Sequence, residues 1–458
     1  MEKNFFLQAL VLTTAHHSTA MKKNILFLLA ASMLATTFSC GDKKPLAETV
    51  IDDPVTQSSP TPTEQIPRVT LSEEQSRCVE AGNAMAFRFL EKMYRGGNLV
   101  VSPLSLQYAM AMTANGAGGE TLREIVGFLG YGDEGLEALN AYCKTMLEQL
   151  PAVDLEVDLR LTDALLVNDK FPLLGSFQKS VQENYYAAVE NMDFGQPSLV
   201  AARINDWAKR STNGFIDKVL EPSEISADAV AYLMNALYFK AAWAGSKYNP
   251  MFREYATHDE AFTLSNGSVR QLPMMRTANF YGYAEMDGYR VLALPYAGGK
   301  FFMYILLPDQ NDLEGLVKKL PDVSWNHIVS SLKHDAEINV KLPKFDIENK
   351  FSLTDALQQL GVEKAFVRGE ADFQAMFQPQ KTHYDYWISK VIQKARISVA
   401  EWGTEAAAVT VVEMVGATSV GPGRIPKRID FFADHPFVFL IGEDSSGAIL
   451  FEGTYTGK

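Results

Sequence analysis

A proline-free stretch of small and β-branched residues, 401–416 (EWGTEAAAVTVVEMVG), constrains the fold of this chain more than any other segment. After Gly403 the even positions carry no charge, and the two charged residues, Glu405 and Glu413, fall on odd positions. Alternate side chains of a β-strand face opposite sides of the sheet, and such residues suit a pleated surface. The segment is therefore predicted to form a strand with one uncharged inward face and one solvated outward face.

The residues that follow, 417–426 (ATSVGPGRIP), have the composition of an exposed loop. A strand that runs into a loop has two interpretations: an ordinary internal strand, or a segment that can itself be added to a sheet. Residues 403–408 (GTEAAA) resemble the hinge of serpins, in which a reactive-centre loop inserts into a sheet. The rest of the chain decides between the two interpretations.

The N-terminal residues 1–40 are predicted to be a signal peptide. Met21 is the expected start, because two lysines and an apolar run, 25–38, follow it, whereas the preceding residues lack a basic region. The run ends at 37–41 (TFSCG), which resembles a bacterial lipoprotein cleavage site and implies that Cys40 carries lipid. A plain secretory signal and an uncleaved anchor are the alternatives. The expected location is the cell envelope of a Gram-negative bacterium, lipid-anchored at the outer membrane and either periplasmic or surface-exposed.

Residues 41–70 are predicted to be a disordered tether, because prolines lie among polar residues with little to bury. Such a segment would hold a folded domain clear of a membrane. The remainder, 71–458, is predicted to form one domain without repeats. Its two cysteines, Cys78 and Cys143, could pair outside the cytoplasm, but we expect free or buried thiols.

Charge and motifs argue against several classes of function. A net charge of −13 does not suit a nucleic-acid binder. The sequence lacks the G-x-S-x-G, H-E-x-x-H, G-x-x-x-x-G-K-[ST] and strand-linked G-x-G-x-x-G motifs. His435, beside Pro436, fits a structural role better than a catalytic one. We therefore expect neither an enzyme nor a cofactor or metal site.

Further motifs occur in the order in which serpins carry them. Ser102 can cap a helix and Pro103 suits its first turn, within a segment similar to the family's "SP-S…GA-G-T" region. Residues 204–214 and 233–243 resemble its "N-W…T-G-I" and "N-YFK--W" segments. Because such matches extend over residues 75–458, the chain is identified as resembling serpins. The resemblance implies an α+β serpin fold of three β-sheets, a helical cluster and an exposed reactive-centre loop at about 401–430.

The resemblance implies a suicide-substrate inhibitor of serine proteases, with cysteine proteases left open as further targets. A protease would cleave the loop and form an acyl-enzyme, and insertion of the segment from Thr404 into the central sheet would then distort it. A monomer is expected, without a polyanion activator, because Lys144 is the one basic residue in 140–150. The implied hinge residues are Glu401, Gly403, Thr404, Ala406, Ala407 and Ala408.

The family's spacing from the hinge glutamate places the reactive bond at Ala417–Thr418. Small apolar residues before this bond suit elastase-like or subtilisin-like proteases. Because the loop is longer than in typical members, other bonds stay open. The alternatives are Met414, Val415 and Val420, with Arg424 implying trypsin-like targets.

Two further groups match regions that control opening of the serpin sheet. Their alternative interpretation is plain core packing. A non-inhibitory serpin that acts as a binding or scaffold protein is the alternative function, although the small, uncharged hinge argues against it; an enzyme on a serpin-like body is a remote third. The matching residues are Ser102, Ser105, Asn235 and Gln393 for the shutter, and Trp243, Lys344 and Glu401 for the breach, where Lys344 and Glu401 are expected to form an ion pair.

Overall fold

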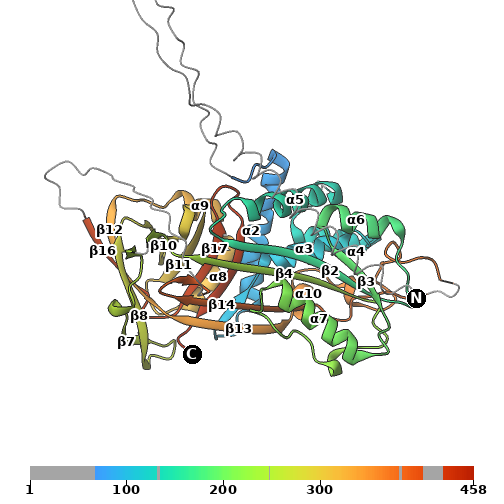
Figure 1. Ribbon diagram of the computed structural model, residues 1–458. Coiled ribbons are helices and arrows are strands. Elements are labelled where there is room, and N and C mark those ends of the chain that lie inside the picture. Colours follow the sequence, from blue (N-terminus) through green and yellow to red (C-terminus); the bar gives the residue numbers. More distant parts are fainter. Residues whose placement is uncertain (1–67, 132–134, 247, 381–383, 406–426) are drawn as a thin grey trace, which may run out of the picture. The chain divides into compact units, whose positions relative to one another are not determined.

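The computed structural model describes residues 68–131, 135–246, 248–380, 384–405 and 427–458 (Figure 1). Three larger β-sheets and a cluster of helices make up this part of the chain, together with a two-stranded hairpin. The predicted α+β class with three sheets and a helical cluster is confirmed. Several predictions concern residues outside the described ranges: Met21, Cys40, Ala406, Ala407, Ala408, Met414, Val415, Ala417, Thr418, Val420 and Arg424.

The α-helices lie mainly in the first half of the chain. Short 3₁₀ turns join several of them to the strands. The helices are α2 (Glu73–Met93), α3 (Pro103–Ala114), α4 (Gly119–Leu129), α5 (Gly135–Gln149), α6 (Gly175–Tyr185), α7 (Pro197–Ser211), α8 (Leu313–Lys319), α9 (Trp325–Ser330) and α10 (Thr354–Gln359).

Serine side chains cap the first turns of α2 and α3. Ser72 caps α2 in a reciprocal pair of hydrogen bonds with Gln75, and the side chain of Ser102 accepts a hydrogen bond from the amide of Ser105 at the start of α3. Pro103 occupies the first turn of α3, where its missing N–H costs nothing. The predicted cap at Ser102 is confirmed.

The central sheet has the strand order β13-β14-β15-β4-β2-β3, and it joins strands from residues 158–242 to strands from residues 345–404. Its strands are β2 (Asp158–Asn168), β3 (Ala188–Met192), β4 (Ala231–Ala242), β13 (Phe345–Ser352), β14 (Ile392–Ala400) and β15 (Gly403–Thr404).

The second sheet has the order β1-β18-β17-β11-β10-β9, and the third the order β16-β12-β8-β7. The second consists of β1 (Leu99–Val101), β9 (Gly282–Met286), β10 (Tyr289–Pro295), β11 (Phe301–Pro308), β17 (Phe437–Glu443) and β18 (Ile449–Tyr455). The third consists of β7 (His258–Thr263), β8 (Val269–Asn279), β12 (Ala336–Pro343) and β16 (Lys427–Phe432), and the hairpin of β5 (Gly245–Ser246) and β6 (Asn249–Pro250).

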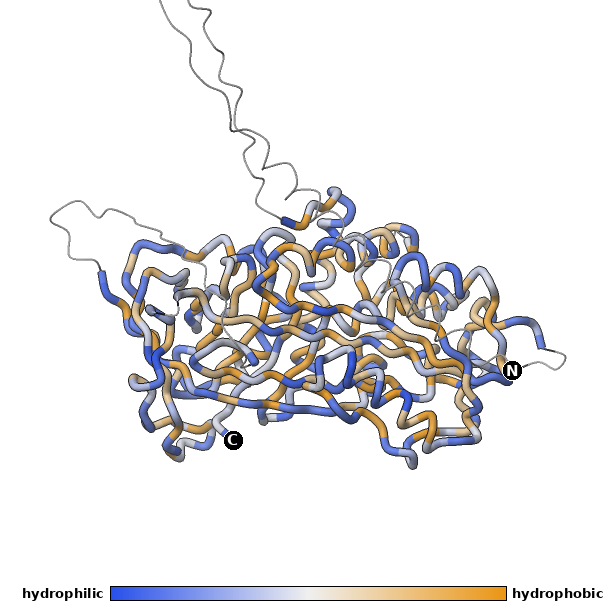
Figure 2. Tube along the Cα trace, viewed as in Figure 1, coloured by the Kyte–Doolittle hydropathy of each residue, from blue (hydrophilic) through white to orange (hydrophobic). Residues whose placement is uncertain are grey.

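The two faces of the central sheet pack against different helices. Odd-numbered residues of β4, such as Phe239 and Ala241, belong to the main core, where α3 contacts the strand. Even-numbered Tyr232 and Met234 pack on a smaller apolar cluster that includes Ile204 of α7. Figure 1 accordingly shows α3 and α7 on opposite sides of β4. Figure 2 shows hydrophobic residues concentrated along the strands between these layers.

The cysteines and His435 were further subjects of the sequence predictions. Cys78 and Cys143 are both buried, and no disulfide joins them. His435 contacts the Asp434 carboxylate and the Pro308 carbonyl, at 2.9 and 2.8 Å, which suits the expected structural role. No helix within the described ranges has the length and apolarity to cross a bilayer. In the same ranges no group of three His, Cys, Asp or Glu residues could hold a metal ion.

Candidate functional site

The short strand β15 lies between β4 and β14 and is antiparallel to both. Thr404 pairs with Ala241 on one side and with Val399 on the other. In the described part of the chain β15 is the only strand that pairs with both β4 and β14, and it covers just one end of each. We call the facing edges of β4 (231–240) and β14 (392–398) the slot. These edges run parallel to each other, and a chain that continued β15 would be antiparallel to both.

The side chain of Thr404 closes the end of the slot. It is 3% exposed, and its hydroxyl makes a hydrogen bond of 2.5 Å with the phenol of Tyr296. The ring of Tyr296 stacks on Trp243 with centroids 4.6 Å apart, and the indole N–H of Trp243 donates to the carbonyl of Ala400. Burial raises the pKa of Tyr296, so its phenol stays neutral. Thr404 is therefore buried, and its hydroxyl has the neutral phenol of Tyr296 as its hydrogen-bond partner.

Gly403 is required by its backbone and by its neighbours. Its φ of +141° is one that residues with a side chain rarely adopt. A Cβ at this position would lie 2.1 Å from the carbonyl oxygen of Ala241. Only glycine lets the chain enter the sheet so close to β4.

The predicted ion pair between Lys344 and Glu401 is confirmed, with 2.8 Å between Nζ and Oε2. The other carboxylate oxygen of Glu401 accepts a hydrogen bond from the hydroxyl of Thr257. Burial raises the pKa of Glu401, but the hydrogen bonds from Lys344 and Thr257 outweigh it, and the pKa lies below its ordinary value. Glu401 is therefore an anchored carboxylate immediately before the slot.

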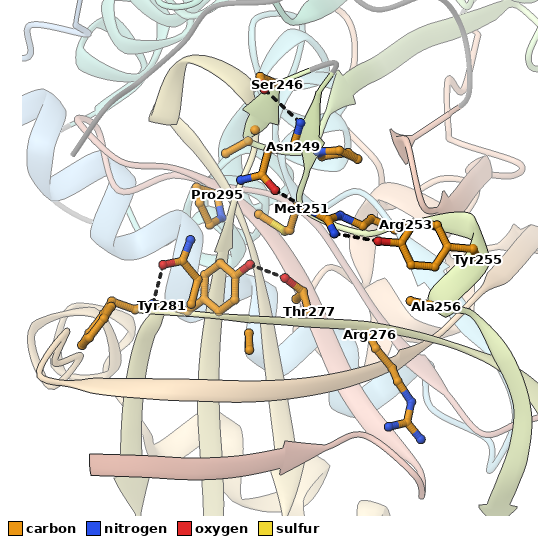
Figure 3. A pocket seen from close by; sticks show the side chains of 16 residues that line it. Ser246, Asn249, Met251, Arg253, Tyr255, Ala256, Arg276, Thr277, Tyr281 and Pro295 are labelled. Carbon is orange, nitrogen blue, oxygen red and sulfur yellow. Dashed lines mark hydrogen bonds between the residues drawn. The ribbon is translucent and has the colours of Figure 1, made fainter. Parts of the chain in front are cut away.

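Trp402, between these anchored residues, has a side chain turned outward. The residue is 43% exposed, and its indole N–H donates to Glu254 at 3.0 Å. Near this segment lies an open cavity of about 720 Å³, which the guanidinium of Arg253 crosses to reach Tyr255 and Asn249 (Figure 3). The cavity lies beside the third sheet, and none of the predicted site residues that the structure describes lines it.

The residues that match the serpin shutter form one connected network under the sheet. The side chain of Gln393 bonds both backbone groups of Ser102, at 3.0 and 2.9 Å. The hydroxyl of Ser102 donates to the carbonyl of Leu450 and accepts from the amide of Ser105. The hydroxyl of Ser105 donates in turn to the side-chain oxygen of Asn235. The four residues that the resemblance groups together are thus connected by hydrogen bonds, and Ser102 joins Gln393 to Ser105 and Asn235.

Sequence reasoning missed the last member of this network, Asp163 of β2. Its Oδ1 accepts a hydrogen bond of 2.7 Å from the amide of Asn235, its direct partner across the β2–β4 pair. Sequence reasoning also missed Tyr296, the partner of Thr404, and Thr257, the partner of Glu401. The one sequence signal for Asp163 is a carboxylate beside the apolar run 164–167.

Comparisons with known proteins agree on one family. The model of the family described as "Serpin (serine protease inhibitor)" matches residues 80–457. The chain is 36% identical to Serpin-Z1A of Triticum aestivum over 371 residues, covering 78% of this chain and 89% of that protein. It is 32% identical to the leukocyte elastase inhibitor of Equus caballus, covering 81% and 96%. The solved structure "Cleaved Serpin 42Da" superposes with a TM-score of 0.73 at 26% identity, covering 84% of this chain and all of that one.

Proposed function

The chain belongs to the serpin family of serine protease inhibitors, and we propose that it inhibits by acting as a suicide substrate. A protease attacks one bond in the loop that follows Thr404 and becomes an acyl-enzyme. The freed segment then inserts into the central sheet and carries the protease with it, so that its active site is distorted. The protein is itself no enzyme in this proposal.

The observation that carries the proposal is the slot. A chain that continued β15 in the observed register would place residue 406 between Phe239 and Ile397, and residue 410 between Asn235 and Gln393. It would meet the first residue of β14 at position 411 and that of β4 at position 414. These edges pair with no other strand in the described ranges, so they suit a strand of eight to eleven residues, and 404–417 supplies enough chain.

The parity of the sequence fits this register. Residues paired across a sheet share a face, so the even positions after Thr404 would point to the core side, as Val399 and Ala241 do. Those positions are uncharged, while Glu405 and Glu413 would face outward. Each ladder hydrogen bond gained contributes about 1 kcal/mol, and full burial of Val412 about 1.5–3 kcal/mol.

The proposed targets are elastase-like or subtilisin-like serine proteases, with Ala417–Thr418 as the reactive bond. The small residues before this bond support the assignment, and a relative 32% identical is named as an inhibitor of leukocyte elastase. The sequence of residues 21–41 supports a lipid-anchored inhibitor in a bacterial envelope. Replacement of Cys40 by serine should then release the protein from the membrane fraction.

A mixture of the protein from Gly41 onward with an elastase-like and a subtilisin-like protease tests the mechanism. We expect a complex that survives a denaturing gel. We also expect a released C-terminal fragment whose mass shows that it begins at Thr418. A complex with another fragment would retain the mechanism and move the bond. Clean cleavage without a complex, for every serine and cysteine protease tried, would favour the non-inhibitory alternative.

A further inference from the structure

Asp163 is a buried acidic residue with few groups around it that could stabilise a negative charge. It is 4% exposed, its Oδ1 has the Asn235 amide as partner, and its buried Oδ2 has no hydrogen-bond partner among the described residues. Buried carboxylates need several donors or a cation to offset the loss of water. A single neutral amide supplies neither, so the ionised form is poorly stabilised here.

In the part of the chain that the structure describes, the titratable groups that face Asp163 supply no positive charge. They are Tyr108 from α3, Cys143 from α5 and Tyr185 from α6. Burial raises the pKa of each of these groups, which therefore remain neutral near pH 7. The neighbour on β4 is the uncharged Asn235. For the same reason, burial raises the pKa of Asp163 itself to about 7, although the hydrogen bond from Asn235 opposes the rise.

The position of Asp163 connects its charge to the slot. Asn235 stands on β4, the edge of the slot, and holds Asp163 of β2 with its amide N–H and Ser105 of α3 with its oxygen. Opening of the central sheet, by which we mean movement of β4 and β2 together over α3 and away from β14, would separate Asn235 from Ser105 and so admit water to Oδ2. Water favours the ionised carboxyl, so such a movement lowers its affinity for a proton.

We propose that Asp163 is a pH-responsive positioning residue of the slot, which makes opening of the central sheet easier as the pH rises through neutrality. The proposal rests on the proposed function only where loop insertion is concerned. By linkage, a step that releases a proton is favoured by up to about tenfold per pH unit for one titrating group. The dependence should level off above about pH 8, once Asp163 is already ionised before the sheet opens.

The matched variant is Asp163→Asn, which keeps the shape and can still accept from Asn235 but does not titrate. The free energy of unfolding of the full chain is measured in denaturant from pH 4 to 9 for both proteins, so that all other groups cancel in the difference. Because the folded pKa lies above the unfolded one, the wild type should lose stability relative to the variant between about pH 4 and pH 7, and not beyond pH 8. A pH-independent difference would overturn the proposal. Asp163→Thr repeats the test if the amide variant folds poorly.

The second readout is the rate at which a synthetic peptide of residues 404–414 enters the slot. The ratio of wild-type to Asp163→Asn rates should rise between pH 5.5 and 7.5 and then flatten. Glu452→Gln is the control, because it removes another buried carboxyl without a partner, on β18, with no hydrogen bond to Asn235 among the described residues. When both proteins carry Glu452→Gln, the ratio of the rate with Asp163 to the rate with Asp163→Asn should rise with pH as before. Failure of the peptide to enter at any pH would count against the slot and the proposed function, whereas the unfolding difference would still decide the role of Asp163.

Discussion

At the scale of single residues, Thr404 occupies a pocket that cannot accept a charge. We predict that Thr404→Arg converts the protein from an inhibitor into a substrate. The guanidinium would have to enter a buried site where the neutral phenol of Tyr296 offers no charge to pair with it, at a cost of several kcal/mol. Since 1.4 kcal/mol corresponds to a tenfold change in rate, covalent complex formation should fall by more than about tenfold while cleavage continues.

Thr404→Ser is the control for this change, because serine keeps the hydroxyl that meets Tyr296. Densitometry of complex and cleaved protein on one denaturing gel gives the partition for each variant. Undiminished complex formation by the arginine variant would rule out this account of the hinge.

Gly403 gives a second prediction at this scale. Gly403→Ala should weaken the attachment of β15, because its Cβ would overlap the carbonyl of Ala241 and the strained backbone alone costs about 1–3 kcal/mol. The expected result is a lower denaturation midpoint together with faster proteolysis next to Trp402. Gly97→Ala, at a position with free space around it and an ordinary φ, is the control. Equal stability of both variants would contradict the requirement for glycine.

The ion pair of Glu401 predicts a dependence on pH with a definite sign. Because the folded pKa of Glu401 is lowered, its contribution is present above the unfolded value of 4.5 and is lost as the pH falls through the folded value. Glu401→Gln should therefore cost about 1 kcal/mol near pH 7, a modest figure because Lys344 is partly exposed, and less at pH 3. Denaturation curves at the two pH values test this, and a cost that is equal at both would contradict it.

Some of these contacts were accessible from the sequence and others were not. The pairing of Lys344 with Glu401 followed from the family resemblance, and the cap at Ser102 from local residue preferences. The contact of Thr257 with Glu401 joins residues 144 positions apart, and no periodicity marks it. Asp163 likewise became meaningful only when the β2–β4 register put it opposite Asn235.

At the scale of elements, the slot predicts that an added strand will bind. A peptide of residues 404–414 should stabilise the protein, by about 2.7 kcal/mol when its concentration is one hundred times its Kd. A peptide of the same composition with glutamates at the positions of 406 and 412 should not, because they would face the apolar side of the sheet. Thermal unfolding with each peptide measures the difference. Equal shifts would show that binding does not depend on the register.

The strand expected over 401–416 is the part of the fold that the sequence predicted least completely. Its alternation of charge gave the correct inward face for Thr404. Within the described residues, however, only Gly403 and Thr404 pair, and the rest of that run lies outside them. Periodicity shows that a segment can be a strand, but the edges of β4 and β14 that form the slot depend on pairings between strands far apart in the chain.

At the scale of the whole molecule, the same slot is open to a second copy of the chain. An exposed strand edge accepts any segment of suitable pattern, and the hinge of another molecule has that pattern by definition. We predict that heating a few degrees below the unfolding midpoint produces chains of monomers, seen as a ladder by size-exclusion chromatography or native gel. The peptide of residues 404–414 should suppress the ladder because it occupies the slot that would otherwise accept the second molecule. Ladders that form equally well with the slot filled would mean that the molecules associate through another surface, and the slot would then explain inhibition alone.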